Sequence, residues 1–275
     1  MIDAATEQSL RIWDGVAPGW EKHRELMNRI ERPVTERMLN AVAARAGDTI
    51  LELAAGPGEV GLELARQHPD ANVVVSDFAP NMVEIAFRAV KERGLANVEC
   101  RIIDAQSIDL PDSSVDGILS RYGLMLVPDV KKAFSEARRI LKPGRTLAYV
   151  VWGPLETNPW MMVMGATLMQ RGHFTPPPGG GFFPLTTQEE NRAVTAMAGF
   201  DSVEVEVLDY PHVHESFESY WRLSTEVSGP LVSIVNGLSE EERRAVHDQV
   251  QEYSAAFRSG DRYEFPSRRI HVRAS

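Results

Sequence analysis

The stretch from Thr49 to Gly61 reads T-I-L-E-L-A-A-G-P-G-E-V-G. An apolar run, interrupted only by Glu52, leads into a glycine-rich turn and then into apolar residues at helical spacing. This order predicts a buried strand, a turn and a helix. The glycines follow the pattern G-x-G-x-x-G, which in dinucleotide-binding proteins lets the backbone approach a pyrophosphate at a helix N-terminus.

Glu52 argues against a phosphate ligand. A strand that is buried on both faces is expected to be continuously apolar, yet this carboxylate lies inside the strand, four residues before Gly56. A phosphate-binding turn gains nothing from a negative charge beside it. S-adenosylmethionine carries an ammonium and a sulfonium and has no phosphate, so acidic groups suit it and repel a dinucleotide.

The segment Glu52-Leu53-Ala54-Ala55-Gly56-Pro57-Gly58 resembles the first motif of the class I S-adenosylmethionine-dependent methyltransferases. That motif is an acidic residue, a turn of small residues and G-x-G. The resemblance implies that Glu52, Ala54, Gly56 and Gly58 bind the cofactor. The chain departs from the family at Ala54, where glycine is usual, and alanine does not readily adopt a positive φ.

Acidic residues also follow the next two predicted strands. Asp77 ends a β-branched run and lies 21 residues beyond Gly56, where a carboxylate can accept hydrogen bonds from two ribose hydroxyls. The alternative is that Asp77 caps a helix that begins near Pro80. Asp104 and Ala105 follow the third strand, expected over residues 97–103.

The resemblance adds roles to these strand ends. It implies that Phe78 and Met82 flank the adenosine, and that Asp104, followed by the small Ala105, accepts from the adenine amino group.

Three later segments are similar to the ubiquinone and menaquinone biosynthesis type of methyltransferase: Val115-Asp116-Gly117, Arg121-Tyr122-Gly123-Leu124 and Arg139-Ile-Leu-Lys-Pro-Gly144. In that family they correspond to the fourth strand, the loop after it and a helix-to-strand corner, and the loop brings Arg121 to the cofactor. Acidic and turn residues thus recur at the ends of successive strands, where a doubly wound sheet binds its ligand. We expect an α/β fold with a seven-stranded, mostly parallel, Rossmann-like sheet.

Composition limits the function. The chain has 275 residues, one cysteine and a formal net charge of −10. Its length suits one α/β domain with insertions, and its acidity disfavours nucleic-acid partners. No apolar run reaches the ~20 residues of a membrane span, and the first residues do not resemble a secretory signal. We therefore expect a soluble, cytoplasmic protein without a membrane span; a homo-oligomer remains open.

We expect a single methyltransferase domain in three parts. Residues 1–46 form an N-terminal helical lid broken at Pro18-Gly19, residues 47–152 form the cofactor-binding core, and residues 153–275 supply the last strands with helical cap insertions. The cap is expected from the N-terminus and from residues 153–200 and 211–262, with single helices over 217–236 and 240–257. Residues 175–181, rich in proline and glycine, predict an irregular loop.

Catalytic residues are harder to assign. Trp20 and His23 on the lid and Tyr122 after the fourth strand are candidate pocket residues, and His23 and Tyr122 are candidates to orient or deprotonate an acceptor. Tryptophans at such spacing also suit simple packing. His212-x-His214 is a weak metal pattern without a further ligand at suitable spacing, and we expect no metal.

We therefore predict S-adenosylmethionine-dependent transfer of a methyl group to an oxygen, nitrogen or carbon nucleophile of a small, apolar or aromatic molecule. An NAD(P)-dependent oxidoreductase would share Gly56, Gly58 and Asp77 but leaves Glu52 and Asp104 unexplained. A non-catalytic cofactor-binding protein of the same fold would show the same motifs.

Overall fold

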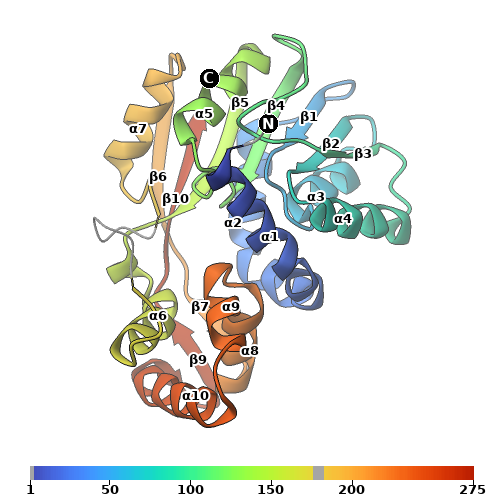
Figure 1. The fold of residues 1–275 in the computed structure, drawn as a ribbon. Helices are drawn as coiled ribbons and strands as arrows, with labels where there is room; N and C mark the ends of the chain where they lie inside the picture. Colours follow the sequence, from blue (N-terminus) through green and yellow to red (C-terminus); the bar gives the residue numbers. More distant parts are fainter. Residues whose placement is uncertain (1–2, 176–182) are drawn as a thin grey trace.

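A computed structural model describes residues 3–175 and 183–275, and a large twisted sheet forms its centre (Figure 1). The strands of this sheet are β1 (Thr49–Glu52), β2 (Asn72–Asp77), β3 (Val98–Ile102), β4 (Val115–Arg121), β5 (Leu141–Trp152), β6 (Val203–Asp209) and β10 (Arg268–Ala274). Their order is β3-β2-β1-β4-β5-β10-β6. The first five strands run parallel to their neighbours, and β10 is antiparallel to both β5 and β6. The expectation of a seven-stranded, mostly parallel sheet is confirmed.

Helices cover both faces of the sheet. They are α2 (Arg24–Val42), α3 (Glu59–Gln67), α4 (Pro80–Arg93), α5 (Val130–Ile140) and α7 (Gln188–Met197). Gly117 of β4 faces Val42 of α2 and lies level with Thr146 of β5. Tyr149 lies three residues beyond Thr146, so it points to the opposite face, where it packs against Phe134 of α5. The central strands of the sheet are therefore buried on both sides, which explains their apolar sequences.

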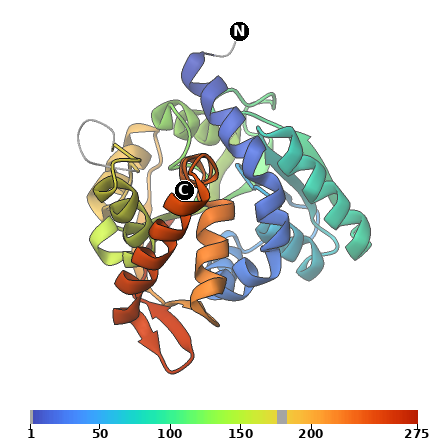
Figure 2. The same ribbon diagram turned by 60° about the horizontal axis from the view of Figure 1, so that its bottom comes forward.

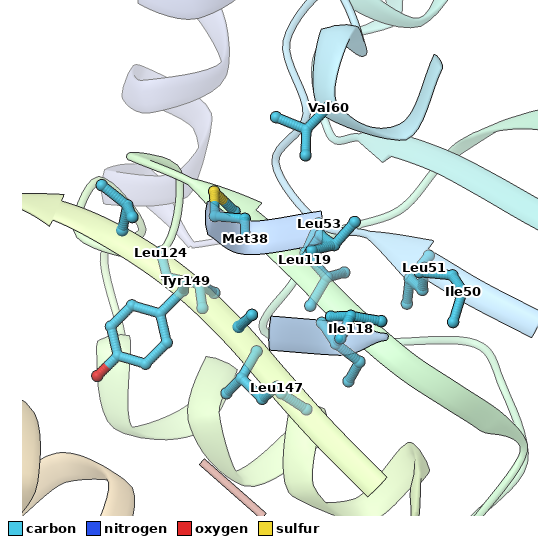
Figure 3. Close-up of a cluster of buried hydrophobic side chains, with 14 of the residues drawn as sticks. Met38, Ile50, Leu51, Leu53, Val60, Ile118, Leu119, Leu124, Leu147 and Tyr149 are labelled. Carbon is cyan, nitrogen blue, oxygen red and sulfur yellow. The ribbon is translucent and has the colours of Figure 1, made fainter. Parts of the chain in front are cut away.

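The centre of the core lies where β1, β4 and β5 run side by side (Figure 3). Ile50, Leu51, Ile118 and Leu147 have no measurable exposure to solvent, and Met38 of α2 packs over them. Complete burial of a Leu or Ile side chain contributes about 1.5–3 kcal/mol. This layer holds the carboxyl ends of β1 and β4 in fixed positions.

The structure places a helix-to-strand corner within residues 139–144, as expected, because α5 ends at Ile140 and β5 follows it directly. Strand β5 already begins at Leu141, which pairs with Val115, and the register then shifts before Gly117 pairs with Thr146. The extra residues form a bulge that accommodates a proline, which cannot donate to the sheet.

The N-terminal lid consists of α1 (Ala4–Lys22) and α2, which meet at His23. The break expected at Pro18-Gly19 is wrong, because α1 continues through both residues. Tertiary packing overrides the local preference: a Cβ on Gly19 would lie 2.0 Å from the carbonyl oxygen of Glu226. Glycine therefore allows α1 to pack closely against the helix that carries Glu226.

The elements between β6 and β10 in the chain form a second layer, which lies below the large sheet in Figure 1 and in front of it in Figure 2. It contains β7 (His212–His214), α8 (Phe217–Val227), α9 (Pro230–Asn236), α10 (Glu240–Ser254), η2 (Ala255–Phe257), β8 (Arg258–Ser259) and β9 (Arg262–Phe265). The short helix η1 (Leu155–Thr157) and α6 (Pro159–Gln170) precede β6, and α6 packs on α10. We call α6, β7–β9 and α8–α10 the cap.

The cap differs from the purely helical one that was expected. Strands β7, β9 and β8 form a small antiparallel sheet, which the sequence analysis missed because the strands are only two to four residues long. The single helix expected over 217–236 divides at Gly229, whose φ of 51° places it in the left-handed region. Helix α7, expected in the cap, packs instead on α5 and β6. The last strand of the large sheet, β10, begins at Arg268.

The loop expected at 175–181 lies almost entirely outside the described residues. Among the described helices, none is long and apolar enough to cross a membrane.

Candidate active site

A cavity opens at the carboxyl edge of the large sheet, where β1, β2, β3 and β4 end. Strand ends at such an edge converge, so residues far apart in the sequence share one site. The lid helices α1 and α2 close one side of the cavity through Trp13, Trp20 and Met27. The loop after β4 closes another side through Leu126 and Val127.

Most of the residues proposed from the sequence line this cavity. They are Ala54, Gly56, Asp77, Phe78, Met82, Asp104, Ala105 and Arg121 from the cofactor set, and Trp20 and Tyr122 from the substrate set. Glu52, Gly58 and His23 are not among its lining residues.

The glycine turn is shaped by close packing as well as by ligand access. Gly58 has φ 82°, and a Cβ there would lie 2.6 Å from Cγ1 of Val75 on β2. Only glycine fits this position, because both the conformation and the space exclude a side chain. Ala54 adopts φ 48°, so alanine does take the left-handed conformation that the sequence analysis doubted.

Glu52 does not face the cavity, which corrects the role inferred for its charge. Its Oε2 accepts a hydrogen bond of 2.6 Å from the backbone N–H of Gly61, in the first turn of α3. Burial raises the pKa of this carboxyl to about 8, because desolvation outweighs the hydrogen bond from Gly61, which lowers the pKa. Glu52 therefore caps the helix behind the turn, a task that Gly58 at the N-cap cannot perform.

Asp77 lies at the cavity wall and also supports the turn. One carboxylate oxygen accepts from the backbone N–H of Gly56 at 2.8 Å, and the other accepts from that of Ala79 at 2.9 Å. Burial raises the pKa of Asp77 to about 6, because desolvation outweighs these bonds. Each oxygen has a second lone pair, so the carboxylate can still accept from a ligand hydroxyl.

Asp104 is organised by a residue that the sequence analysis did not identify. Its Oδ1 accepts from the backbone N–H of Gln106 at 2.8 Å and from the side-chain amide of Gln106 at 3.1 Å. The amide oxygen of Gln106 accepts from the backbone N–H of Asp129, which caps α5. Gln106 thus connects the end of β3 to α5. Asp104 and Gln106 both line the cavity.

Among the described lining residues, Arg121 carries the positive charge, and Asp77 and Asp104 are the two carboxylates. Its Nη1 donates to the hydroxyl of Thr35 on α2 at 2.8 Å, which fixes the guanidinium against the lid. The indole N–H of Trp20 is buried at this cavity without a hydrogen-bond partner in the described residues. The cavity therefore offers one cation, two acidic acceptors and one free donor.

Tyr122 presents its ring to the cavity and its hydroxyl to the protein interior. The hydroxyl donates to Glu31 of α2, and Arg269 of β10 pairs with the same carboxylate at 2.8 Å. Burial, and then the negative charge of Glu31, raise the pKa of Tyr122 well above its ordinary value. The phenol stays protonated and engaged, so the suggestion that Tyr122 acts as a base is wrong. Its backbone has φ 63°, a strained conformation for a tyrosine.

His23 is also removed from the cavity. Its Nε2 lies 2.9 Å from Oε2 of Glu226 on α8, and Lys22 pairs with the same carboxylate. The histidine occupies the corner between α1 and α2 and contributes to the contact of the lid with the cap. The suggestion that it contacts an acceptor in this cavity is not supported by its position.

The remaining lining residues were not proposed from the sequence. They are Trp13, Met27, Ala55, Pro57, Ile103, Gln106, Gly123, Leu126, Val127 and Pro128. Gln106 could have been considered, because it follows Asp104 directly after a strand end. The apolar members carry no chemical signature, and only the packing of the lid over the sheet brings them together.

Three comparisons with known proteins agree with this geometry. Residues 50–144 match the sequence profile of a family described as a methyltransferase domain. The demethylmenaquinone methyltransferase of Listeria welshimeri is 24% identical over 191 residues, 69% of this chain and 79% of that protein. The malonyl-[acyl-carrier protein] O-methyltransferase of Geobacter sulfurreducens is 27% identical over 241 residues, 84% of this chain and 86% of that protein.

Among solved structures, the YcgJ protein from Bacillus subtilis shares the fold. It superposes with a TM-score of 0.59 at 20% identity and covers 87% of this chain and 96% of its own.

The strand order, the cavity at the carboxyl edge and the glycine turn after β1 define a Rossmann-like methyltransferase fold. The sequence matches carry the assignment further. The chain is a class I S-adenosylmethionine-dependent methyltransferase, and S-adenosylmethionine is its cofactor.

Proposed function

We propose that the methyl acceptor is a small, largely apolar or aromatic molecule with an oxygen, nitrogen or carbon nucleophile, and not a nucleic acid. The observation that carries this proposal is the apolar part of the cavity lining, which includes Trp13, Trp20, Met27 and Leu126. A net charge of −10 also disfavours a polyanionic acceptor.

The polar residues of the cavity suit S-adenosylmethionine. Asp77 would accept from the ribose hydroxyls, and Asp104 with Gln106 would bind the adenine amino group. Arg121 is the cation available to the carboxylate of the methionine part. The unpartnered indole N–H of Trp20 supplies a further donor. Two carboxylates at this edge repel a pyrophosphate, which disfavours NAD(P).

When bound, S-adenosylmethionine supplies a methyl group on a sulfonium, which is already a good leaving group. The protein then has to hold the acceptor in line and exclude water. Tyr122 and Met27 would form the apolar surface against which an acceptor packs. No cavity residue needs to act as a base when the acceptor nucleophile is unprotonated.

A methyl-transfer screen tests the acceptor class. Phenols, quinols, amines and short oligonucleotides are incubated with the chain and methyl-labelled S-adenosylmethionine. We expect label on phenols or quinols, because a planar ring matches the aromatic wall. Turnover confined to oligonucleotides would refute the small-molecule proposal.

Cofactor binding is measured separately by calorimetry. We expect S-adenosylhomocysteine to bind and NADH and NADPH to give no heat. A chain that binds the homocysteine product but methylates none of the panel would leave the cofactor assignment intact and reject the acceptor class.

A further inference from the structure

The ring of Tyr122 has one face covered by the protein and one face that is not. It stacks on Trp152 with centroids 3.9 Å apart and planes 3° apart. Tyr122 is one of the described residues that line the cofactor cavity, and Trp152 is not. The face that Trp152 covers is therefore turned away from the cavity.

The hydroxyl end of the same ring is occupied as well. The hydroxyl donates to Glu31, and Nε of Arg269 donates to the hydroxyl oxygen at 3.0 Å. Glu31 and Arg269 have no measurable exposure to solvent and pair with each other at 2.8 Å, so they add no net charge. The uncovered face is thus the part of the side chain that remains to line the cavity.

The backbone fixes this ring beside the glycine turn. The N–H of Tyr122 donates to the carbonyl of Val150 at 2.8 Å. The next residue is Gly123, where a Cβ would collide with Cβ of Ala54 in the glycine turn. The loop after β4 therefore packs directly on the turn after β1. A ring held in this way loses little freedom when a ligand binds to it.

The strand order indicates which part of the cofactor lies near this ring. Asp104 follows β3 and would bind the adenine, and Asp77 ends β2 and would bind the ribose. Strand β1 lies between β2 and β4. Neighbouring strands are about 4.8 Å apart, so the edge from β3 to β4 spans roughly 14 Å. The methionine part continues from the ribose away from the adenine, and it therefore reaches the ends of β1 and β4, where Tyr122 lies.

We propose that the uncovered face of Tyr122 receives the sulfonium of S-adenosylmethionine in a cation–π contact, which distinguishes the charged methyl donor from its neutral product, S-adenosylhomocysteine. The proposal rests on the proposed function, which places the adenine and the ribose. The face of an aromatic ring is electronegative and attracts a cation, most strongly where water is excluded. The S–CH₃ bond has to point past the ring, because an acceptor approaches the methyl carbon in line with that bond.

This contact favours the exchange of product for donor. Methyl transfer removes the positive charge from the sulfur, so the product keeps the adenine and ribose contacts and loses the attraction to the ring. Arg121 would bind the carboxylate that donor and product share. Asp77 and Arg121 are present in the wild type and in every variant of Tyr122, so a change in the ratio of the two affinities isolates the ring.

NMR of the bound methyl group tests the contact directly. The full chain is saturated with S-adenosylmethionine that carries a ¹³C-labelled methyl group. We expect the methyl protons to shift upfield from those of the free cofactor and to show nuclear Overhauser contacts with the ring protons of Tyr122. These ring signals are assigned by comparison with Tyr122→Phe. Absence of the contacts in the wild type overturns the proposal.

Calorimetry measures the selectivity for charge. The quantity compared is the Kd of S-adenosylhomocysteine divided by that of S-adenosylmethionine. Tyr122→Leu removes the ring, and we expect the ratio to fall by about three- to thirtyfold. Tyr122→Phe keeps the ring and loses only the hydroxyl, so its ratio should stay within twofold of the wild type. A ratio that falls less than threefold in Tyr122→Leu contradicts the proposal.

Phe134→Leu is the matched control for the loss of a buried ring. Phe134 packs against Tyr149 and is not among the described lining residues, so the ratio and the methyl shift should both stay unchanged. If Tyr122→Leu does not fold, the Overhauser contacts in the wild type decide. A methyl-transfer screen that labels only oligonucleotides would reject the proposed function and leave both measurements unaffected, because neither contains an acceptor.

Discussion

Buried polar groups have different hydrogen-bond partners in the two halves of the molecule, which are the cofactor half around β1–β4 and the cap. At the carboxyl edge of β1–β4, Glu52 and Asp77 accept backbone hydrogen bonds that hold the glycine turn. In the cap, His212 and His214 bond each other, and no other described residue bonds their ring nitrogens. The first half is preorganised by bonds between side chains and its own backbone, whereas the buried pair in the cap bonds no backbone group among the described residues.

The match of the family profile divides the molecule at a similar place. The family profile covers residues 50–144, which include the strands β1–β4 and their cavity residues. The cap lies outside that match. A shared cofactor requires a shared site, whereas elements outside that site are free to differ. Changes in the cofactor half should therefore alter cofactor affinity, and changes in the cap should not.

The largest effect is expected where the lid is joined to the large sheet. Glu31, Tyr122 and Arg269 form a buried network between the lid, the loop after β4 and strand β10. Glu31→Ala leaves the Arg269 guanidinium buried and unpaired, and should lower the free energy of unfolding by about 3–5 kcal/mol in urea denaturation. Arg32→Ala, at an exposed pair with Glu36, is the control and should change it by less than about 0.5 kcal/mol. Equal effects would show that the network does not hold the lid to the large sheet.

Asp77→Ala should have the next largest effect, on cofactor affinity. The variant loses the acceptor of two proposed ribose bonds and the support of Gly56, so calorimetry should show S-adenosylhomocysteine binding weaker by about 2–4 kcal/mol. Asp209→Ala, an exposed partner of Arg268, should leave the Kd unchanged. A wild-type Kd in Asp77→Ala would move the ribose away from this carboxylate.

Gly58→Ala tests whether the turn is fixed by packing. The added Cβ meets Val75 and takes φ 82°, so thermal unfolding should show a loss of about 2–3 kcal/mol. Gly47→Ala has nearly the same φ, 81°, and open space around it, and should lose only about 1 kcal/mol. Equal losses would mean that conformation alone, without the contact with Val75, requires glycine.

Glu52→Gln tests the correction to the role of that carboxyl. The folded pKa of about 8 exceeds the ordinary 4.5, so the folded state keeps a proton that the unfolded state has lost. The contribution of this carboxyl to the free energy of unfolding is complete below about pH 4.5 and declines as the pH rises to about 8. Between about pH 6 and pH 7, the wild type should lose about 1 kcal/mol relative to Glu52→Gln in urea titrations. Parallel pH profiles for the two proteins would show that Glu52 is ionised when folded.

The smallest effect is expected from Tyr220→Phe in the cap. The variant removes a 2.6 Å hydrogen bond to the carbonyl of Trp160 and should cost about 1 kcal/mol of stability. Its Kd for S-adenosylhomocysteine should equal that of the wild type. A weakened cofactor Kd would show that the cap and the cofactor half are coupled.

The sequence by itself predicted the elements whose signals are local. The run of Ile50 and Leu51, the glycines after it and the acids at 77 and 104 are each visible within a few residues. Because parallel strands end at one edge, these local signals also predicted that the cofactor residues share a cavity. The large sheet and most of the proposed cofactor residues followed from that rule.

Tertiary structure alone decided where the side chains point and what completes the site. Glu52 turns toward Gly61 and away from the cavity, and His23 pairs with Glu226, 203 residues away in the chain. Tyr122 meets a carboxylate 91 residues before it, and Arg269 reaches the same carboxylate across 238 residues. The hydrophobic periodicity of the sequence does not predict such contacts, because they depend on how helices and strands pack after each has formed.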